Sequence, residues 1–335
     1  MKVAVIGAGS WGTTLAHVLG ENGCNVGLWA RKPEVVSGIN TDHRNPRYLS
    51  DSTLSENVVA TTSHKDACLR AKAVVVVTPS SMARGVARSL ADCVDQDTPV
   101  IICSKGVEAG TGMTSTQVFD QEMGNAGRLA VLSGPNHAEE IIKGVPAGTV
   151  IASESKDTAV FFQDLFACQA LRTYTSTDVT GVQLCAAFKN VIAIAVGLSY
   201  GMGYGDNTAS LLLTRGLAEM SRLVSAAGGN PLTCMGLAGT GDLVATCMSR
   251  HSRNRTFGEK LAGGMSLEEY KEQTHMVVEG ALACQTLDAL SVKYNVELPI
   301  TCIVRGVVWE GADIPASIQA LSSRSLKEEL YGLEG

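Results

Sequence analysis

The sequence predicts an α/β domain with a mainly parallel sheet, residues 1–177, followed by an all-α domain, residues 178–335. Three observations support this prediction. The chain has 335 residues, more than a single hydrophobic core usually accommodates. Short β-branched runs alternate with helical segments in the first half, as in a parallel sheet covered by helices. The second half is dominated by long segments with helical periodicity.

Six short runs rich in Val, Ile and Leu are the predicted strands of the first domain. The run VVVVT is apolar almost throughout, as expected of a strand buried on both faces, and it ends before Pro79. Residues 11–21 form a predicted helix after the first strand. The six strands are predicted at residues 3–6, 26–29, 74–78, 100–103, 129–132 and 149–152.

The second domain opens on the only segment apolar enough to raise the question of a membrane span. Asp178 is a suitable N-cap for a helix over residues 178–200, and Gly201 is a suitable end. Polar residues such as Lys189 interrupt the segment, which favours a buried helix. Further helices are predicted at residues 207–227, 267–270, 278–294 and 299–311.

The composition excludes some classes of partner. Hydrophobic residues make up 45% of the chain and charged residues 18%, which is ordinary for a globular protein. The net charge is −6 without a dense Lys/Arg cluster, which argues against nucleic acid or an anionic membrane as partner. The first residues lack the apolar block of a signal peptide, so we expect a cytoplasmic protein. Ten cysteines without a C-x-x-C pair are expected to be reduced, with no metal site.

A glycine-rich motif, GAGSWG, follows the first predicted strand and opens the first helix. Gly7, Gly9 and Gly12 have the G-x-G-x-x-G spacing. Gly7 allows a tight turn, Gly9 lets the backbone approach a pyrophosphate at the helix N-terminus, and Gly12 lets helix and strand pack closely. The motif predicts a Rossmann-like dinucleotide-binding domain. The alternative is a glycine-rich turn without a ligand.

The second predicted strand is followed by ARKPE. Arg31 and Lys32 therefore stand where a dinucleotide fold usually has an acidic residue for the ribose 2′-hydroxyl. Two cations suit a 2′-phosphate, which favours NADPH, with NADH as the other possible cofactor. A solvated basic pair on a loop would explain the same residues.

The residues that directly follow predicted strands are candidates for ligand contact, because parallel sheets bind ligands beyond the carboxyl ends of their strands. Lys105 would place a cation there, or would be an ordinary surface lysine, and Gly134 would let backbone amides approach a ligand. The three segments are Thr78-Pro79-Ser80, Ser104-Lys105-Gly106 and Ser133-Gly134-Pro135-Asn136.

Lys189 is an isolated charge in the predicted helix over residues 178–200. Gln183 and Asn190 share one face of this helix, and Lys189 lies one position away among apolar residues. A buried ammonium is costly without a partner, and burial lowers the pKa of a lysine towards the range of proton exchange near neutral pH. We therefore expect a functional lysine. The alternative is a side chain that extends its ammonium to solvent.

Two later segments supply candidate partners. In GLAGTGDLVAT, Asp242 follows a glycine turn and begins an apolar helical segment, so it is either a simple N-cap or the carboxylate that positions Lys189. In HSRNRTFG, Arg253 and Arg255 flank Asn254. This segment is either a compact set of donors for a phosphate or a polar turn between helices.

Together these motifs resemble, over nearly the whole chain, those of the bacterial NAD(P)-dependent glycerol-3-phosphate dehydrogenases. Several motifs in one order are far more specific than any one of them. One segment departs from the family: GPNHA replaces the usual G-P-S/T-F-A, so Asn136 can still donate a hydrogen bond while His137 replaces an apolar aromatic residue. The matching segments are GAGSWG, SKG, SGP, FKNVIAIAVGLSYGMGYGDN, ASLLLTRG, GTGDLVAT, SRNRTFG and VVEG.

The resemblance implies reversible hydride transfer between a nicotinamide and C2 of glycerol 3-phosphate or dihydroxyacetone phosphate, mainly as a reductase supplying phospholipid synthesis. It also implies a homodimer. It implies that Lys189 is the general acid/base, oriented by Asp242, Asn190 and Thr246. The implied substrate positions are Lys105, Gly134, Asn136, Lys189, Asp242, Ser252, Arg253 and Asn254. The implied cofactor positions are Gly7, Gly9, Ser10, Trp11, Gly12, Arg31, Lys32, Tyr48, Pro79, Lys105, Ala138, Arg253, Val277 and Glu279.

Two other functions are compatible with the residues alone. A two-domain hydroxy-acid dehydrogenase would use the same kind of cofactor domain and a catalytic lysine, but its carboxylate substrate would need fewer donors than the set at residues 253–255. A non-catalytic dinucleotide sensor would bind NAD(P)H without any turnover that depends on Lys189.

Overall fold

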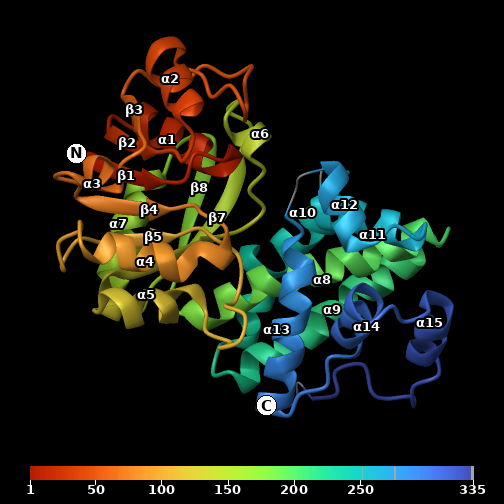
Figure 1. Cartoon of the computed structure of the whole chain (residues 1–335). Helices are drawn as coiled ribbons and strands as arrows, with labels where there is room; N and C mark the ends of the chain where they lie inside the picture. Colours follow the sequence, from red (N-terminus) through yellow and green to blue (C-terminus); the bar gives the residue numbers. More distant parts are fainter. Residues whose placement is uncertain (251, 275–276, 333–335) are drawn as a thin grey trace. The chain divides into compact units, whose positions relative to one another are not determined.

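The computed structural model describes residues 1–250, 252–274 and 277–332. The chain forms two compact units (Figure 1). The first consists of Met1–Lys105 and Met113–Val179, and the second of Gly106–Gly112 and Thr180–Gly335. The first unit combines a sheet with helices, whereas the described residues from 180 onward form helices and no strand. This confirms the predicted fold class, an α/β part followed by an all-α part.

The first unit contains one eight-stranded sheet with the order β3-β2-β1-β4-β5-β6-β7-β8. All neighbouring strands run parallel except β6 and β7. The order reverses between β1 and β4, which is where sheets of this kind bind ligands. The strands are β1 (Lys2–Ile6), β2 (Asn25–Trp29), β3 (Val58–Thr61), β4 (Ala73–Val76), β5 (Val100–Ile102), β6 (Leu129–Ser133), β7 (Ala147–Ala152) and β8 (Leu171–Ser176).

The two edge strands, β3 and β8, are absent from the sequence prediction. Their residues alternate between buried and exposed for most of their length, and β8 contains Arg172 and three threonines or serines. The prediction relied on continuous apolar runs, which are typical only of strands buried on both faces. Edge strands expose alternate side chains, so the prediction of six strands was incomplete.

Helices cover both faces of this sheet (Figure 1). Val3 and Val5 of β1 pack in one core cluster with Leu15 and Phe162. Ala4, between the two valines, is equally buried and points to the opposite face. The helices are α1 (Ser10–Glu21), α2 (Pro33–Asp42), α3 (His64–Cys68), α4 (Ala83–Ala91), α5 (Ser115–Met123), α6 (Ala138–Ile141) and α7 (Lys156–Phe166), with short 3-10 turns η1 (Ser80–Met82) and η2 (Ala126–Arg128).

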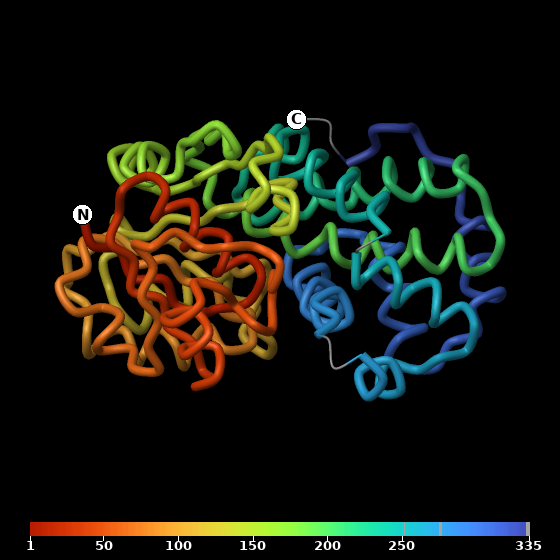
Figure 2. Tube along the Cα trace, turned by 90° about the horizontal axis from the view of Figure 1, so that it is seen from above, coloured from red at the N-terminus to blue at the C-terminus, as the bar shows by residue number. Residues whose placement is uncertain are grey.

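The second unit is built on two long helices, α8 and α9, which run side by side (Figure 2). A Cβ on Gly216 of α9 would lie 2.7 Å from the Ile192 side chain of α8, so the two helices pack closely there. The helices are α8 (Val179–Gly201), α9 (Asp206–Ala226), α10 (Asp242–Met248), α11 (Arg253–Ala262), α12 (Leu267–Thr274), α13 (Glu279–Tyr294), α14 (Pro299–Trp309) and α15 (Ile314–Ser322). Two short turns, η3 (Pro231–Met235) and η4 (Leu237–Gly241), precede α10.

Helix α8 is the predicted apolar helix. It begins one residue after Asp178 and includes Gly201. Its length and composition would allow it to cross a membrane, but 89% of its most apolar 18-residue stretch is buried inside the protein. It is therefore a core helix, as the polar residues within it indicated.

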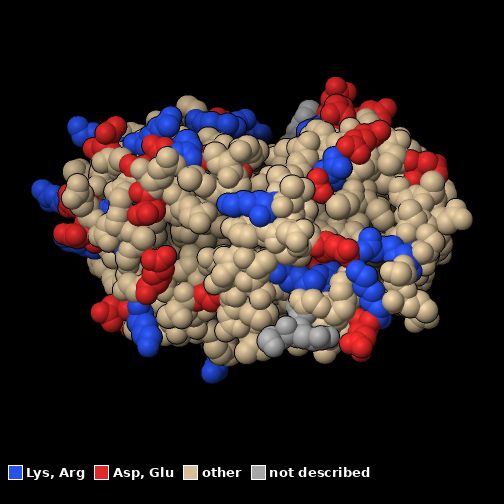
Figure 3. All heavy atoms as spheres, turned by 90° about the horizontal axis from the view of Figure 1, so that it is seen from below, with Lys and Arg blue, Asp and Glu red and all other residues tan. Residues whose placement is uncertain are grey.

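Charged side chains of both signs are interspersed on the face of the molecule in Figure 3.

Candidate active site

The glycine-rich loop between β1 and α1 has the geometry of an anion-binding turn. Gly7 has φ +121°, and a Cβ there would lie 2.6 Å from the carbonyl oxygen of Val77. A Cβ on Gly12 would lie 1.8 Å from the carbonyl oxygen of Gly7. A Cβ on Gly9 would meet no atom within 4 Å, so the backbone there faces open space. No side chain caps the N-terminus of α1, which leaves its N–H groups to an anion or water.

Asn45 is a residue of this site that the sequence prediction missed. It is fully buried. Its amide nitrogen donates to the carbonyl oxygen of Ala8 at 3.0 Å and to the hydroxyl of Thr13 at 2.8 Å, and its amide oxygen accepts from the backbone N–H of Tyr48 at 3.2 Å. Asn45 thus holds the loop of Tyr48 against the glycine-rich loop. An Asn-Pro pair signals a turn in the sequence, but not its contact with residue 8.

Five buried polar groups of the first unit have no hydrogen-bond partner among the described residues, and three of these are the indole N–H of Trp11 and the hydroxyls of Thr78 and Ser133. Thr78 follows β4 and Ser133 ends β6, so both lie where parallel sheets bind ligands. A buried polar group without a partner costs free energy, and such groups usually meet a ligand or a water molecule. These groups and the open glycine loop fit a bound dinucleotide.

The two cations after β2 differ in their surroundings. The Lys32 ammonium lies 3.9 Å from the Glu34 carboxylate, and Arg47 pairs with the same carboxylate at 3.3 Å. Arg31 is exposed and forms no ion pair with a described residue. The loop therefore offers one cation that is already paired and one that is not.

Lys105 and Gly134 meet beyond the strand ends. The Lys105 ammonium donates to the carbonyl oxygen of Gly134 at 3.1 Å. Gly134 has φ +154°, and a Cβ there would lie 2.9 Å from the carbonyl oxygen of Gly148, so a side chain does not fit. Asn136 donates to Gly148 at 3.0 Å and accepts from the Thr149 hydroxyl at 2.9 Å. These bonds tie Asn136 to β7 and leave one of its amide N–H groups for another partner.

The remaining predicted cofactor positions lie at the starts of helices. Ser10 opens α1, Pro79 directly precedes η1, and Ala138 opens α6. In the second unit, Glu279 opens α13, and Val277 lies two residues before it with 42% of its surface exposed.

Lys189 lies in the middle of α8 and is 6% exposed. Its ammonium forms an ion pair with Asp242 Oδ1 and donates to the Thr246 hydroxyl at 3.0 Å. Thr246 also donates to Asp242 Oδ1 at 3.4 Å. Asp242 and Thr246 lie one turn apart on α10 and are themselves buried. The charge is buried and paired, so the alternative of an ammonium that extends to solvent is wrong.

The chain before Asp242 makes an unusual turn. The backbone N–H of Gly241 donates to the carbonyl oxygen of Gly236 at 3.1 Å, a π-type bond within η4. A Cβ on Gly239 would lie 2.1 Å from the carbonyl oxygen of Cys234, so only glycine fits. Single π turns occur often at functional sites. Gly241 takes the N-cap position of α10, which leaves the Asp242 side chain to Lys189 rather than to an N-cap.

A second polar pair neighbours Lys189. Asn254 of α11 donates to Asn190 Oδ1 at 2.9 Å, and Asn254 Oδ1 accepts from the backbone N–H of Gly280 at 2.9 Å. A Cβ on Gly280 would lie 2.4 Å from the carbonyl oxygen of Asn190. Asn254 therefore joins α8, α11 and α13 and keeps one amide N–H for another partner.

From Arg253 onward, the predicted donor segment is helix α11 and not a polar turn. Ser252 is its N-cap and accepts from the backbone N–H of Arg255 at 3.3 Å. The Arg255 guanidinium pairs with Glu259 at 2.9 Å and donates to the carbonyl oxygen of Met248 at 2.7 Å. Arg253 is exposed and forms no ion pair with a described residue. Of the two arginines predicted as phosphate donors, Arg255 is committed to local structure and Arg253 is available.

The described residues contain no group of three or more His, Cys, Asp or Glu side chains placed to hold a metal ion.

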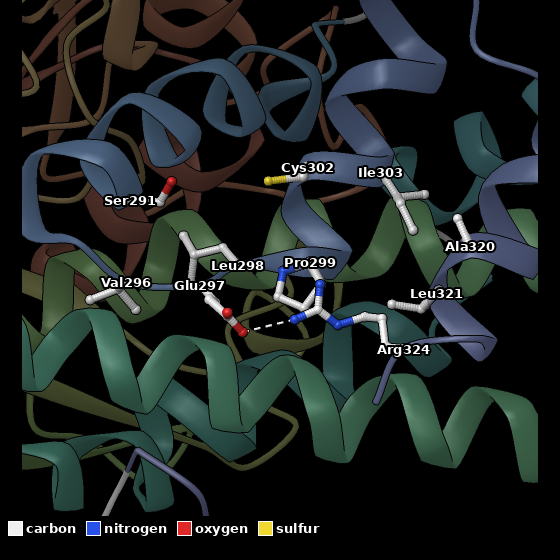
Figure 4. A pocket seen from close by; sticks show the side chains of 10 residues that line it. All are labelled: Ser291, Val296, Glu297, Leu298, Pro299, Cys302, Ile303, Ala320, Leu321 and Arg324. Atoms are coloured by element: carbon white, nitrogen blue, oxygen red, sulfur yellow. Dashed lines mark hydrogen bonds and ion pairs between the residues drawn. The ribbon is translucent and has the colours of Figure 1, made fainter. Parts of the chain in front are cut away.

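The second unit also has a pocket of about 410 Å³ beside α14 (Figure 4). Arg324 and Glu297 line this pocket, point toward each other and pair at 2.8 Å. No predicted site residue lines this pocket.

Comparison with known proteins identifies the family. The model for the N-terminus of NAD-dependent glycerol-3-phosphate dehydrogenase matches residues 2–159, and the model for the C-terminus matches residues 178–319. This chain belongs to the NAD-dependent glycerol-3-phosphate dehydrogenase family. The resemblance inferred from the motifs is thus confirmed, and so is a Rossmann-like domain of the NAD(P)-dependent class.

Individual relatives of the family match almost end to end. Glycerol-3-phosphate dehydrogenase (NAD(P)+) of Chlorobium phaeobacteroides is 42% identical over 333 residues, 99% of this chain and 100% of that protein. The enzyme of the same name from Thermobifida fusca is 44% identical over 334 residues, 99% of each. The crystal structure of glycerol-3-phosphate dehydrogenase from Coxiella burnetii has a TM-score of 0.91 at 34% identity and covers 96% of this chain and 99% of that one.

Proposed function

We propose that this protein interconverts dihydroxyacetone phosphate and sn-glycerol 3-phosphate with NAD(P)H, mainly as a reductase that supplies glycerol 3-phosphate for phospholipid synthesis. The buried pair of Lys189 and Asp242 carries the proposal, because it holds a proton donor in a fixed position. Residues 1–177 would bind the cofactor, and residues 178–335 would carry the catalytic groups. We further propose that the enzyme is a cytoplasmic homodimer.

The reaction needs a hydride and a proton. A bound reduced nicotinamide supplies the hydride to C2 of the ketone. The Lys189 ammonium donates its proton to the C2 oxygen as negative charge develops there, and neutral Lys189 takes that proton back in the oxidative direction. Asp242 stabilises the ammonium, and the Thr246 hydroxyl, 3.0 Å from Lys189 Nζ, helps to fix its position. Burial strengthens these interactions because little water screens them.

Arg253 is the proposed anchor of the substrate phosphate. Its guanidinium lies at the first residue of α11, where the helix dipole and unpaired N–H groups also favour an anion. A guanidinium matches the geometry of phosphate with two parallel hydrogen bonds. Ser252 and Asn254 on either side position it, and Asn254 has an amide N–H to contribute. This donor set favours a phosphorylated ketone over a simple carboxylate.

Parallel assays of NADPH oxidation test the reaction and its alternative. We expect turnover with dihydroxyacetone phosphate and little with 2-oxo acids of similar size. Turnover confined to the 2-oxo acids would identify a hydroxy-acid dehydrogenase instead. In Arg253→Ala, KM for dihydroxyacetone phosphate should rise by at least tenfold while KM for NADPH changes less. Arg255→Ala is no suitable control because Arg255 holds α11 to α10.

The unpaired guanidinium of Arg31 supports NADPH as the preferred cofactor. In Arg31→Asp, the ratio of kcat/KM for NADPH to kcat/KM for NADH should fall by about tenfold or more, since a carboxylate repels the 2′-phosphate. Lys32→Ala is the matched control with a smaller expected change, because Lys32 already faces Glu34. An unchanged ratio in Arg31→Asp would mean that the ribose end of the cofactor lies elsewhere.

A further inference from the structure

Two cysteine thiols touch inside the second unit. The sulfur atoms of Cys185 in α8 and Cys234 in η3 lie 3.6 Å apart, and both residues are fully buried. They are 49 positions apart in the sequence. Neither forms a disulfide bond. A separation of 3.6 Å is a van der Waals contact, so the two sulfur atoms need to approach by about 1.5 Å to become covalently joined.

The two thiols lie on the two elements that carry the proposed proton donor and its carboxylate. Cys185 precedes Lys189 by one helical turn, so the two side chains share a face of α8. Cys234 lies in the turn that leads through η4 into α10, where Asp242 is the first residue.

The chain between Cys234 and Asp242 has little freedom to absorb a shift. The Thr240 hydroxyl donates to the carbonyl oxygen of Cys234 at 2.9 Å. A Cβ on Gly239 would lie 2.1 Å from that same oxygen, so the two backbone segments are in direct contact. A movement of Cys234 is therefore transmitted to residues 239 and 240, which lie three and two positions before Asp242.

We propose that Cys185 and Cys234 are a thiol modification site at which a peroxide forms a disulfide that switches the proton-transfer pair off. The bond draws Cys234 toward α8, and the η4 turn moves with it. Asp242 then shifts relative to Lys189, and the proton transfer slows. The effect on turnover rests on the proposed function, whereas formation of the disulfide does not.

The chemistry is that of a dithiol with hydrogen peroxide or an organic hydroperoxide. One thiol, as thiolate, attacks the peroxide oxygen, the O–O bond breaks, and a sulfenic acid forms with release of water or an alcohol. The second thiol attacks that sulfur, the S–S bond forms, and water leaves. The two sulfur atoms together lose two electrons, which reduce the peroxide. A dithiol reductant reverses the change by thiol–disulfide exchange.

The other cysteines provide the contrast. Cys302 is exposed, but its thiol donates to the Asp288 carboxylate at 3.1 Å, and burial of the sulfur with this neighbour raises its pKa to about 12. Exposure alone therefore does not make Cys302 a nucleophile. The thiols of Cys185 and Cys234, in contrast, contact each other.

The experiment combines peptide mapping with activity. The full-length protein is treated with hydrogen peroxide, alkylated and digested with trypsin and with a protease that cleaves before aspartate. Cleavage before Asp242 separates Cys234 from Cys247, which share one tryptic peptide. We expect a linked pair of peptides containing Cys185 and Cys234, two hydrogen masses below the sum of the free thiol forms. Absence of this pair at every peroxide concentration would overturn the proposal.

Activity with dihydroxyacetone phosphate is the second readout. The oxidised wild type should lose at least tenfold in kcat, with the dissociation constant for NADPH little changed, and dithiothreitol should restore it. Cys185→Ala and Cys234→Ala should each lose less than twofold under the same treatment, while Cys302→Ser should respond like the wild type. Equal loss in the alanine variants would also overturn the proposal. If the untreated protein has no turnover with dihydroxyacetone phosphate, the proposed function fails. The linked peptide then still tests whether Cys185 and Cys234 form a disulfide.

Discussion

The helical unit buries two carboxylates to the same extent, and their partners differ in kind. Asp242 and Glu219 are 2% and 1% exposed. Asp242 accepts from the ammonium of Lys189 and from a hydroxyl. Glu219 accepts from the backbone N–H groups of Ile300 at 2.6 Å and Thr301 at 3.3 Å, and from the Thr301 hydroxyl at 3.2 Å. One carboxylate faces a group that can release a proton, and the other caps a helix.

The cap explains why Glu219 is buried at all. The N-cap residue of α14 is Leu298, which has no side-chain acceptor for the first N–H groups of the helix. Glu219, on α9, supplies that acceptor from a distant part of the chain. Burial raises the pKa of Glu219 to about 7, although the N–H groups, Arg222 and the hydroxyl oppose the shift. Burial of a carboxylate alone is therefore no sign of catalysis, and its partner decides the role.

The largest expected effect is the loss of the proton donor. Lys189→Ala should lower kcat by on the order of a hundredfold or more, because no other described group stands in its place to protonate the C2 oxygen. NADPH affinity, measured by fluorescence titration, should stay within a few fold. A non-catalytic sensor would have no turnover to lose, and near-normal turnover in Lys189→Ala would remove this lysine from the mechanism.

Substitution of the two carboxylates should affect kcat differently. Asp242→Asn keeps the shape but removes the charge, which leaves a buried ammonium without its counter-ion. We expect kcat to fall by about thirtyfold and its pH profile to move to lower pH, because an unpaired ammonium loses its proton more readily. Glu219→Gln should leave kcat and its pH profile within twofold. A similar fall in both variants would show that burial rather than the partner matters.

Glu219 should instead appear in the pH dependence of stability. Its pKa is raised from 4.5 to about 7 in the folded protein, so between these values the folded state binds more protons than the unfolded chain. The free energy of unfolding contributed by this group is therefore highest below pH 4.5, falls as pH rises and is constant above about pH 7. From pH 5 to pH 7 the fall should be about 2 kcal/mol.

Chemical denaturation of the wild type and Glu219→Gln at several pH values measures this contribution. The stability of the wild type relative to the variant should decrease across the window by that amount. A constant difference between the two proteins from pH 5 to pH 7 would mean that Glu219 does not titrate there. Asp242→Asn is no control for this measurement because it also unpairs Lys189.

The role of Asp242 could be predicted from the sequence, whereas the burial of Glu219 could not, for a physical reason. Lys189 is conspicuous as a charge in an apolar helix, which favoured a buried partner over an ammonium that extends to solvent, and Asp242 after its glycine turn was a candidate. Glu219 lies in TRGLAEMSRL, where the pattern of Arg and Glu predicts the solvent-exposed face of an amphipathic helix. Its burial depends on where α14 packs, 81 residues later, and no local pattern encodes that.

The same limit applies to the fold and to the other site residues. The strands buried on both faces were predicted from their apolar runs, whereas β3 and β8 were not, because edge strands alternate. The roles of Gly7, Gly9 and Gly12 follow from spacing and agree with the space around each. The contact of Asn45 with Ala8 and the commitment of Arg255 to Glu259 depend on tertiary packing. Spacing predicts local geometry, and long-range partners need the folded structure.

The smallest effects on stability and kcat are expected for the two threonines whose hydroxyls donate to these carboxylates. Thr246→Val removes a hydroxyl bonded to both Lys189 and Asp242, and Thr301→Val removes one bonded to Glu219. Both variants leave a buried partner one hydrogen bond short, so each should lose about 1 kcal/mol of stability. Only Thr246→Val should also lower kcat, by about fivefold, because the ammonium then loses one of the groups that fix its position. An equal kcat in the two variants would show that the Asp242 contact alone positions Lys189.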